Sequence, residues 1–239
     1  MTVGSVLGEA WGLYTKFFTR FFAIAALVYL VVNLVNAVVA EAIGTSGGVR
    51  ALLELVSVVV TLIGTFWLQG TLVSAVADVR DGKIDTTISS LFERVEPLVL
   101  RLIGAGILAG LGIGVGLILL IVPGLILLTW WSLIIPVIVM ENRHVGESFS
   151  RSRELVRGHA WTVFAVVVIT AILSAIASGI IEAIFSFLGA FLRFWIGGTI
   201  ASAIVGPFFA VAATVMYFRL QELRNPAQPL PAGADPASS

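Results

Sequence analysis

Long apolar segments alternate with short polar ones along almost the whole chain. Each of the six main segments is close to the roughly 20 residues that a helix needs to cross the hydrocarbon core of a bilayer. They cover residues 21–40, 55–77, 102–120, 124–140, 160–181 and 197–218. This pattern predicts an all-α integral membrane protein with six transmembrane helices.

The basic residues fall almost entirely on one side of these predicted spans. If the chain begins in the cytoplasm, only Arg50 and Arg193 of its 14 lysines and arginines lie on the far side. Basic loops are held back on the cytoplasmic side during membrane insertion. We therefore expect both termini to lie in the cytoplasm.

A helical stripe of mostly apolar residues recurs three times, each time just before an odd-numbered span. Its members follow the spacing i, i+4, i+7, i+11, which marks one face of a helix. The stripes are Val3, Leu7, Ala10 and Tyr14; Ile84, Ile88, Leu91 and Val95; and Val145, Phe149, Ser152 and Val156. We interpret each as an amphipathic helix in the cytoplasmic membrane interface, followed by a transmembrane hairpin. Chance similarity between short amphipathic helices is the alternative.

This repeat organises residues 1–224 as one six-span domain built from three hairpins. The units cover about 1–80, 81–141 and 142–224, and the tail at 225–239 is rich in proline and alanine and is expected to be disordered.

Glycine and proline predict local features of these hairpins. The first should close through residues 44–48 and the second through Pro123-Gly124, while Pro207 should kink the sixth span. Small residues let membrane helices approach closely. The third span carries Gly106, Gly110 and Gly114 on one face and Gly112 and Gly116 as a second pair. We therefore expect the third span to be central in the bundle.

Composition narrows the function classes. The chain is 59% hydrophobic and 12% charged, with a mean hydropathy of +1.06 and no net charge, which gives no case for nucleic-acid binding. It has no cysteine, so disulfides and thiolate metal sites are excluded. Its two histidines, His144 and His159, are fifteen residues apart, and no catalytic motif accompanies them. We expect no enzyme activity, cofactor or metal site.

Two groups of residues are candidates for binding. Asn33 and Asn36 in the first span, with Glu54 and Glu182 near the outer interface, could form an intramembrane polar site or could simply be hydrated there. The cluster Arg143, Arg151, Arg153 and Arg157 could bind anionic phospholipid headgroups. Topology alone also accounts for such charges, and Glu147 is well spaced to pair with Arg151.

The run from residue 122 to 161 resembles the membrane domain attached to some bacterial glycerophosphoryl diester phosphodiesterases, which also occurs free-standing. The matching positions include Pro123, Gly124, Pro136, Glu141, Ser152 and Gly158, with Tyr217 as a later match. The resemblance implies a multi-span module of the bacterial inner membrane. The catalytic barrel of those enzymes requires a His-Arg-Gly start and a Glu-x-Asp pair, and neither occurs in this chain.

These observations favour a non-catalytic inner-membrane protein that binds or organises anionic phospholipid, or scaffolds a partner protein at the cytoplasmic face. A small transporter or lipid translocator, with a polar crevice between hairpins, is the alternative. Oligomeric state and the identity of any protein partner have no sequence signal.

Overall fold

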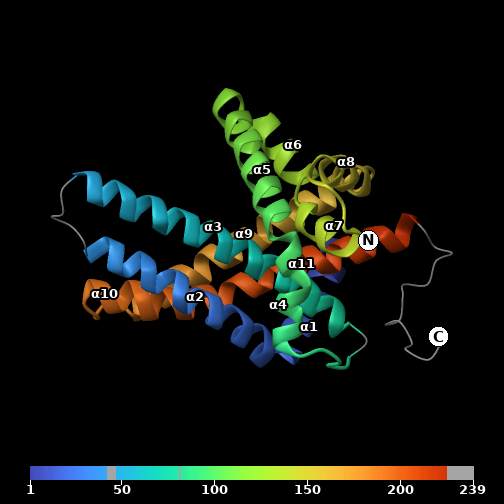
Figure 1. Ribbon diagram of the computed structural model, residues 1–239. Helices are drawn as coiled ribbons and strands as arrows, with labels where there is room; N and C mark the ends of the chain where they lie inside the picture. The colour runs from blue at the N-terminus through green and yellow to red at the C-terminus, as the bar shows by residue number, and fades with distance from the viewer. Residues whose placement is uncertain (42–46, 81, 225–239) are drawn as a thin grey trace.

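The computed structural model describes residues 1–41, 47–80 and 82–224, and all regular structure within these ranges is helical (Figure 1). Six helical segments are long and apolar enough to cross a membrane, which confirms the prediction of a multi-span all-α protein. They run over Phe18–Glu41, Gly47–Asp78, Ile88–Leu119, Ile121–Glu141, Ala160–Ile184 and Ala190–Arg224. The predicted tail at 225–239 and most of the predicted loop at 44–48 lie outside the described residues.

Three of these segments are single helices, and three contain breaks. The first, second and fifth segments are α2 (Phe18–Glu41), α3 (Gly47–Asp78) and α9 (Ala160–Ile184). The third joins α4 (Ile88–Val95), η1 (Glu96–Leu98) and α5 (Val99–Leu119). The fourth joins α6 (Ile121–Trp130) to α7 (Ile134–Glu141), and the sixth joins α10 (Ala190–Leu192), η2 (Arg193–Gly197) and α11 (Gly198–Arg224). The remaining helices are α1 (Val3–Lys16) and α8 (Val145–Val156).

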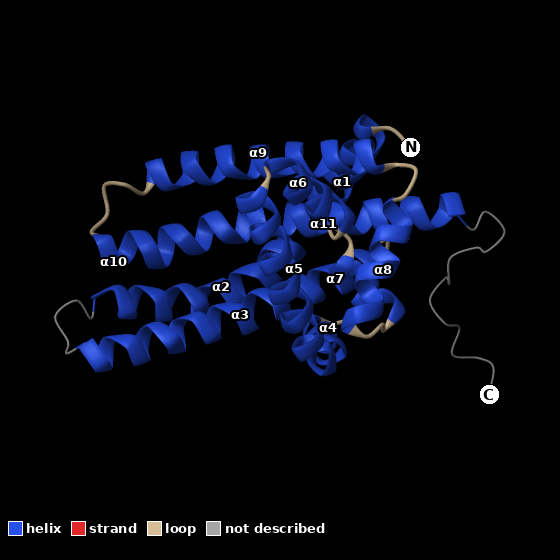
Figure 2. Cartoon of the chain, turned by 90° about the horizontal axis from the view of Figure 1, so that it is seen from above, coloured by secondary structure: helices blue, strands red, loops and turns tan. Residues whose placement is uncertain are grey.

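Helices α2, α3, α9 and α11 run side by side as a bundle (Figures 1 and 2). The end at which α2 and α9 begin and α3 and α11 end is called here the basic end. Figure 2 shows α1, α4 and α8 gathered towards this end, on the right, opposite the α9–α10 connection.

Helix α11, not the third span, is the centre of the bundle. In its most apolar stretch 61% of residues are buried, against 17% in the third span. Helix α11 packs against α1, α2, α3 and α9. Its Pro207 is buried inside the helix, and the carbonyl of Ile204, one turn earlier, accepts a hydrogen bond from the Tyr14 hydroxyl at 2.7 Å. A proline removes the helical hydrogen bond to the carbonyl four residues earlier, here that of Ala203, so Tyr14 adds a hydrogen bond beside the turn that Pro207 weakens.

The expectation of a central third span was wrong because α5 and α6 leave the bundle together. This pair, Val99–Trp130, is called here the α5–α6 arm, and Figure 1 shows it standing away from the four bundle helices and across their direction. Its tip is apolar and open: Ile118 is 85% exposed and Ile121 69% exposed. Such a surface requires lipid or another protein around it.

The turn of the arm also differs from the prediction. The chain reverses at Leu120, whose backbone is extended (φ −158°, ψ 131°), whereas Pro123 and Gly124 lie in the first turn of α6. A Cβ placed on Gly124 would lie 2.6 Å from the backbone nitrogen of Leu117, so glycine is needed there for the two helices to touch. Gly116 faces Gly124 from α5 in the same contact.

The three short helices begin near the predicted places, with shifted faces. Helix α1 buries Val6 in addition to the expected Ala10 and Tyr14. Helix α4 begins at Ile88, because Thr87 caps its first turn by accepting the Ser90 amide N–H. The expected first member of that stripe, Ile84, therefore lies outside the helix and is 59% exposed.

Candidate functional site

Glu141, at the end of α7, is the acceptor for three side chains from different parts of the chain. Its carboxylate receives hydrogen bonds from Arg143 at 2.9 Å, from Arg151 at 3.0 Å to both oxygens, and from the Tyr217 hydroxyl at 3.1 Å. The Glu141 side chain is only 13% exposed, so these bonds are partly shielded from water. This cluster joins α7, α8 and α11.

Ser152, on α8, repairs the break between α6 and α7. Its hydroxyl donates to the Trp130 carbonyl at 2.6 Å and accepts the Leu133 amide N–H at 3.3 Å. Those two backbone groups flank the break, and a buried backbone group left unpaired costs as much as a lost hydrogen bond. Ser152 is fully buried, so no water competes for these bonds.

Helix α8 is flanked on both sides by a residue with a left-handed backbone conformation. Asn142 before it has a φ of 50°, and Gly158 after it has a φ of +92°, a conformation that glycine adopts at little cost. At its far end, Arg224 donates to the carbonyls of Glu154 and Arg157 and forms an ion pair with the Glu154 carboxylate. A cation suits the carbonyl end of a helix dipole.

Most of the residues singled out by the sequence motif lie in one structural unit. Glu141 and Tyr217 connect α7 to α11, and Ser152 connects α8 to the α6–α7 break. Pro136 is buried within α7, and Gly158 follows α8 in a left-handed conformation. Within the part of the chain that the structure describes, this unit contains no group of three metal-ligating residues.

The four candidate headgroup arginines divide into two pairs. Arg143 and Arg151 are engaged by Glu141, and Arg151 also pairs with Glu154 at 3.1 Å rather than with Glu147. Burial acts to lower the pKa of Arg151, but its hydrogen bonds to the two glutamates outweigh this and raise the pKa. These two arginines stabilise the fold.

Arg153 and Arg157 are the other pair, and both are exposed. Neither has a carboxylate partner among the described residues. The Arg153 guanidinium lies over the Trp130 ring at 4.2 Å from its centroid, which fixes the position of the cation. The positive charge of Arg153 therefore lies against the Trp130 ring.

The same Trp130 lines an apolar groove between α6 and α9. The groove encloses about 330 Å³, and its walls include Leu125, Ile126, Trp161 and Phe164. The hydroxyl of Thr129, which also borders it, already donates to the Leu125 carbonyl at 2.7 Å. Trp161 stands 84% exposed at its rim. A cation, two indoles and an apolar groove are therefore contiguous.

The four residues predicted for an intramembrane polar site do not share a partner. Asn33 donates to Thr199 at 3.4 Å, and Asn36 donates to Thr61 at 3.3 Å, so the two amides bond to different helices. The third and fourth residues are carboxylates. Glu54 pairs with Arg50 one turn away, with both side chains 55% exposed, and Glu182 borders a cavity of about 420 Å³ that Arg193 also lines.

Sequence reasoning missed the groove. Its walls come from α6 and α9, which are separated by the whole of α7 and α8, and no spacing rule connects Trp130 with Trp161 or Phe164. The available signal was the presence of two aromatic residues, Trp161 and Phe164, at the start of α9, directly after the basic helix α8.

Comparison of this chain with protein-family models, with curated proteins and with solved structures found no match.

Proposed function

We propose that the protein lies in the inner membrane of a bacterial cell with its basic end in the cytoplasm. In this arrangement α1, α4 and α8 lie in the cytoplasmic interface. Helices α1 and α8 each precede two of the four bundle helices, and α4 precedes the α5–α6 arm. The distribution of lysine and arginine supports this orientation. The exposed apolar surfaces of the six long segments support a lipid environment.

The proposed function is non-catalytic binding of an anionic phospholipid at the junction of α6, α8 and α9. One observation carries it: Trp130 contacts the unpaired Arg153 cation and also forms a wall of the apolar groove. A phospholipid has the same division, with a phosphate at one end and an acyl chain at the other.

Each part of the site has a physical role. A basic residue near the surface of an anionic membrane contributes about 1 kcal/mol, and a guanidinium can donate two parallel hydrogen bonds to a phosphate. The groove receives an acyl chain because its walls are apolar. Exposed Trp161 suits the headgroup level, where the indole body meets hydrocarbon and its N–H meets water.

Native mass spectrometry with lipid analysis tests this function. We compare the wild type with a variant carrying Arg153→Gln and Arg157→Gln, and leave Arg151 intact because it holds Glu141. Arg94→Gln is the control, since Arg94 is an exposed arginine on α4, outside the groove.

We expect the wild type and the Arg94→Gln control to retain an anionic phospholipid selectively. The double variant should lose most of it, because the loss of two charge contributions corresponds to about a 30-fold weaker affinity. Equal retention by all three proteins would contradict the proposed site.

A further inference from the structure

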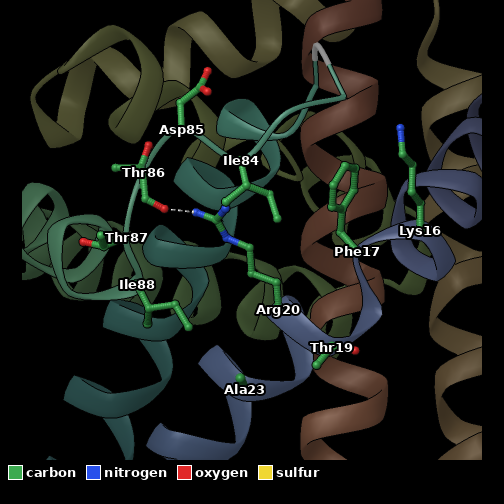
Figure 3. Close-up of a pocket in the computed structure, with 10 residues that line it drawn as sticks. All are labelled: Lys16, Phe17, Thr19, Arg20, Ala23, Ile84, Asp85, Thr86, Thr87 and Ile88. Carbon is green, nitrogen blue, oxygen red and sulfur yellow. Dashed lines mark hydrogen bonds between the residues drawn. The ribbon is translucent and has the colours of Figure 1, made fainter.

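Another cavity lies at the basic end, between the start of α2 and the connection from α3 to α4. It is open, encloses about 620 Å³, and is lined by Lys16, Phe17, Arg20, Ile84 and Asp85 among others (Figure 3). It shares no lining residue with the α6–α9 groove.

Arg20 is held in place by one of its nitrogens. Its Nη2 donates to the Asp78 carboxylate at 2.8 Å and to the Thr86 carbonyl at 2.6 Å. The side chains of Arg20 and Asp78 are each 7% exposed. Asp78 is occupied in turn, since it also accepts the hydroxyl and the amide N–H of Thr86.

The remaining donors of Arg20 have no acceptor. A guanidinium carries five N–H bonds, and the three on Nε and Nη1 are buried without a hydrogen-bond partner in the described part of the protein. A buried donor without an acceptor lowers the stability of the fold, and the effect is larger when the donor belongs to a charged group. Arg20 therefore has unused capacity for an anion.

The surroundings allow an anion to reach these donors. Ile84 lines the cavity together with Arg20 and is 59% exposed, so its side chain has room to move when an anion approaches. The Asp85 carboxylate points away from Arg20, and the Lys16 ammonium stands across Phe17 from it (Figure 3).

We propose that this cavity binds a phosphate group through Arg20, with Lys16 supplying a second charge. A phosphate has several oxygens, which suits the three unused N–H bonds, and charge-assisted bonds to it are strong. The group belongs either to a lipid headgroup at the membrane surface or to a soluble phosphate. This site is independent of the α6–α9 groove, so either can fail alone.

NMR of the Arg20 Nε–H group tests the proposal at the atom that carries it. We place arginine-labelled full-length protein in phosphatidylcholine nanodiscs, assign the Arg20 signal with Arg20→Lys, and add inorganic phosphate. A parallel arm replaces part of the lipid with phosphatidic acid, and sodium chloride at equal ionic strength is the control.

We expect a saturable shift of the Arg20 signal with phosphate or with phosphatidic acid, and none with chloride. A shift with phosphatidic acid alone identifies a lipid headgroup, and a shift with inorganic phosphate identifies a soluble source. An unchanged signal in both arms would overturn the proposal.

Two variants check the position of the site. Lys16→Gln leaves the Arg20–Asp78 pair intact and should weaken binding about threefold or more, since one interfacial charge is lost. Arg153→Gln, in the other site, should bind as the wild type does. Equal affinity in the wild type and Lys16→Gln would overturn the assignment to this cavity.

Discussion

The Tyr217 hydroxyl donates to the Glu141 carboxylate at 3.1 Å, across 76 positions of sequence, and so connects central helix α11 to α7. Arg151 adds α8 to the same carboxylate. Glu141→Gln should lower the free energy of unfolding by about 2 kcal/mol, because it leaves a partly buried guanidinium with one partner fewer. Unfolding in mixed detergent–SDS micelles measures this loss.

Glu54→Gln is the matched control for Glu141→Gln. It removes the same charge from an exposed pair, Arg50–Glu54, and exposed pairs contribute less than about 1 kcal/mol. Equal losses of stability in the two variants would contradict the role assigned to the Glu141 cluster.

Ser152→Ala should destabilise the protein by about 1–3 kcal/mol, because it leaves the Trp130 carbonyl and the Leu133 amide unpaired in the interior. Ser150→Ala is the control on the same helix, since the exposed Ser150 hydroxyl bonds only to the Glu147 carbonyl within α8. The same unfolding measurement compares them. A neutral Ser152→Ala would show that the α6–α7 break does not need this hydroxyl.

Gly124→Ala should cost about 1–3 kcal/mol, because its new Cβ would meet the Leu117 backbone and force α5 and α6 apart. Gly110→Ala should cost nothing, since a Cβ there meets no atom within 4 Å. Thermal unfolding in one detergent ranks the two. If both variants match the wild type, the close contact within the α5–α6 arm is not formed.

The raised pKa of Tyr14 predicts that the stability of the protein falls at alkaline pH. Burial raises the pKa of Tyr14 from 10.0 to about 12, so the folded state holds the phenolic proton more tightly than the unfolded state. The contribution of Tyr14 to stability is therefore complete below pH 10 and is lost as the pH rises towards 12. Tyr14→Phe should flatten this decline.

Ultraviolet titration of the tyrosines checks the Tyr14 assignment. Subtracting the Tyr14→Phe curve from that of the wild type should leave one group that ionises near pH 12. A difference curve centred near pH 10 would mean that Tyr14 is not buried against α11.

The spans and the short helices could be predicted because both depend on local periodicity. Packing partners could not. The glycines of the third span show where a helix can be approached, and Gly106 does face Phe66, but Gly110 and Gly114 have no neighbour within 4 Å. A proline such as Pro123 fits a turn and the first turn of a helix equally well, so the reversal at Leu120 had no distinct signal.

The candidate site was only partly predictable for the same reason. All four arginines of the cluster look alike in sequence, and only the fold shows that Glu141, ten positions before Arg151, engages two of them. The charge pattern therefore found the right helix, but the distinction between Arg151 and Arg153 required tertiary structure. The Arg20 cavity had no sequence signal, because its partner Asp78 lies 58 positions away.

Photolabelling with phosphatidylglycerol that carries a photoreactive acyl chain tests the central claim most directly. With the wild type in nanodiscs, peptide mapping should find adducts concentrated in the groove walls, residues 122–130 and 160–164. Arg153→Gln should remove most of them, while Arg94→Gln should leave them in place. Adducts spread evenly over the lipid-facing surfaces of all six spans, and unchanged by Arg153→Gln, would contradict the account.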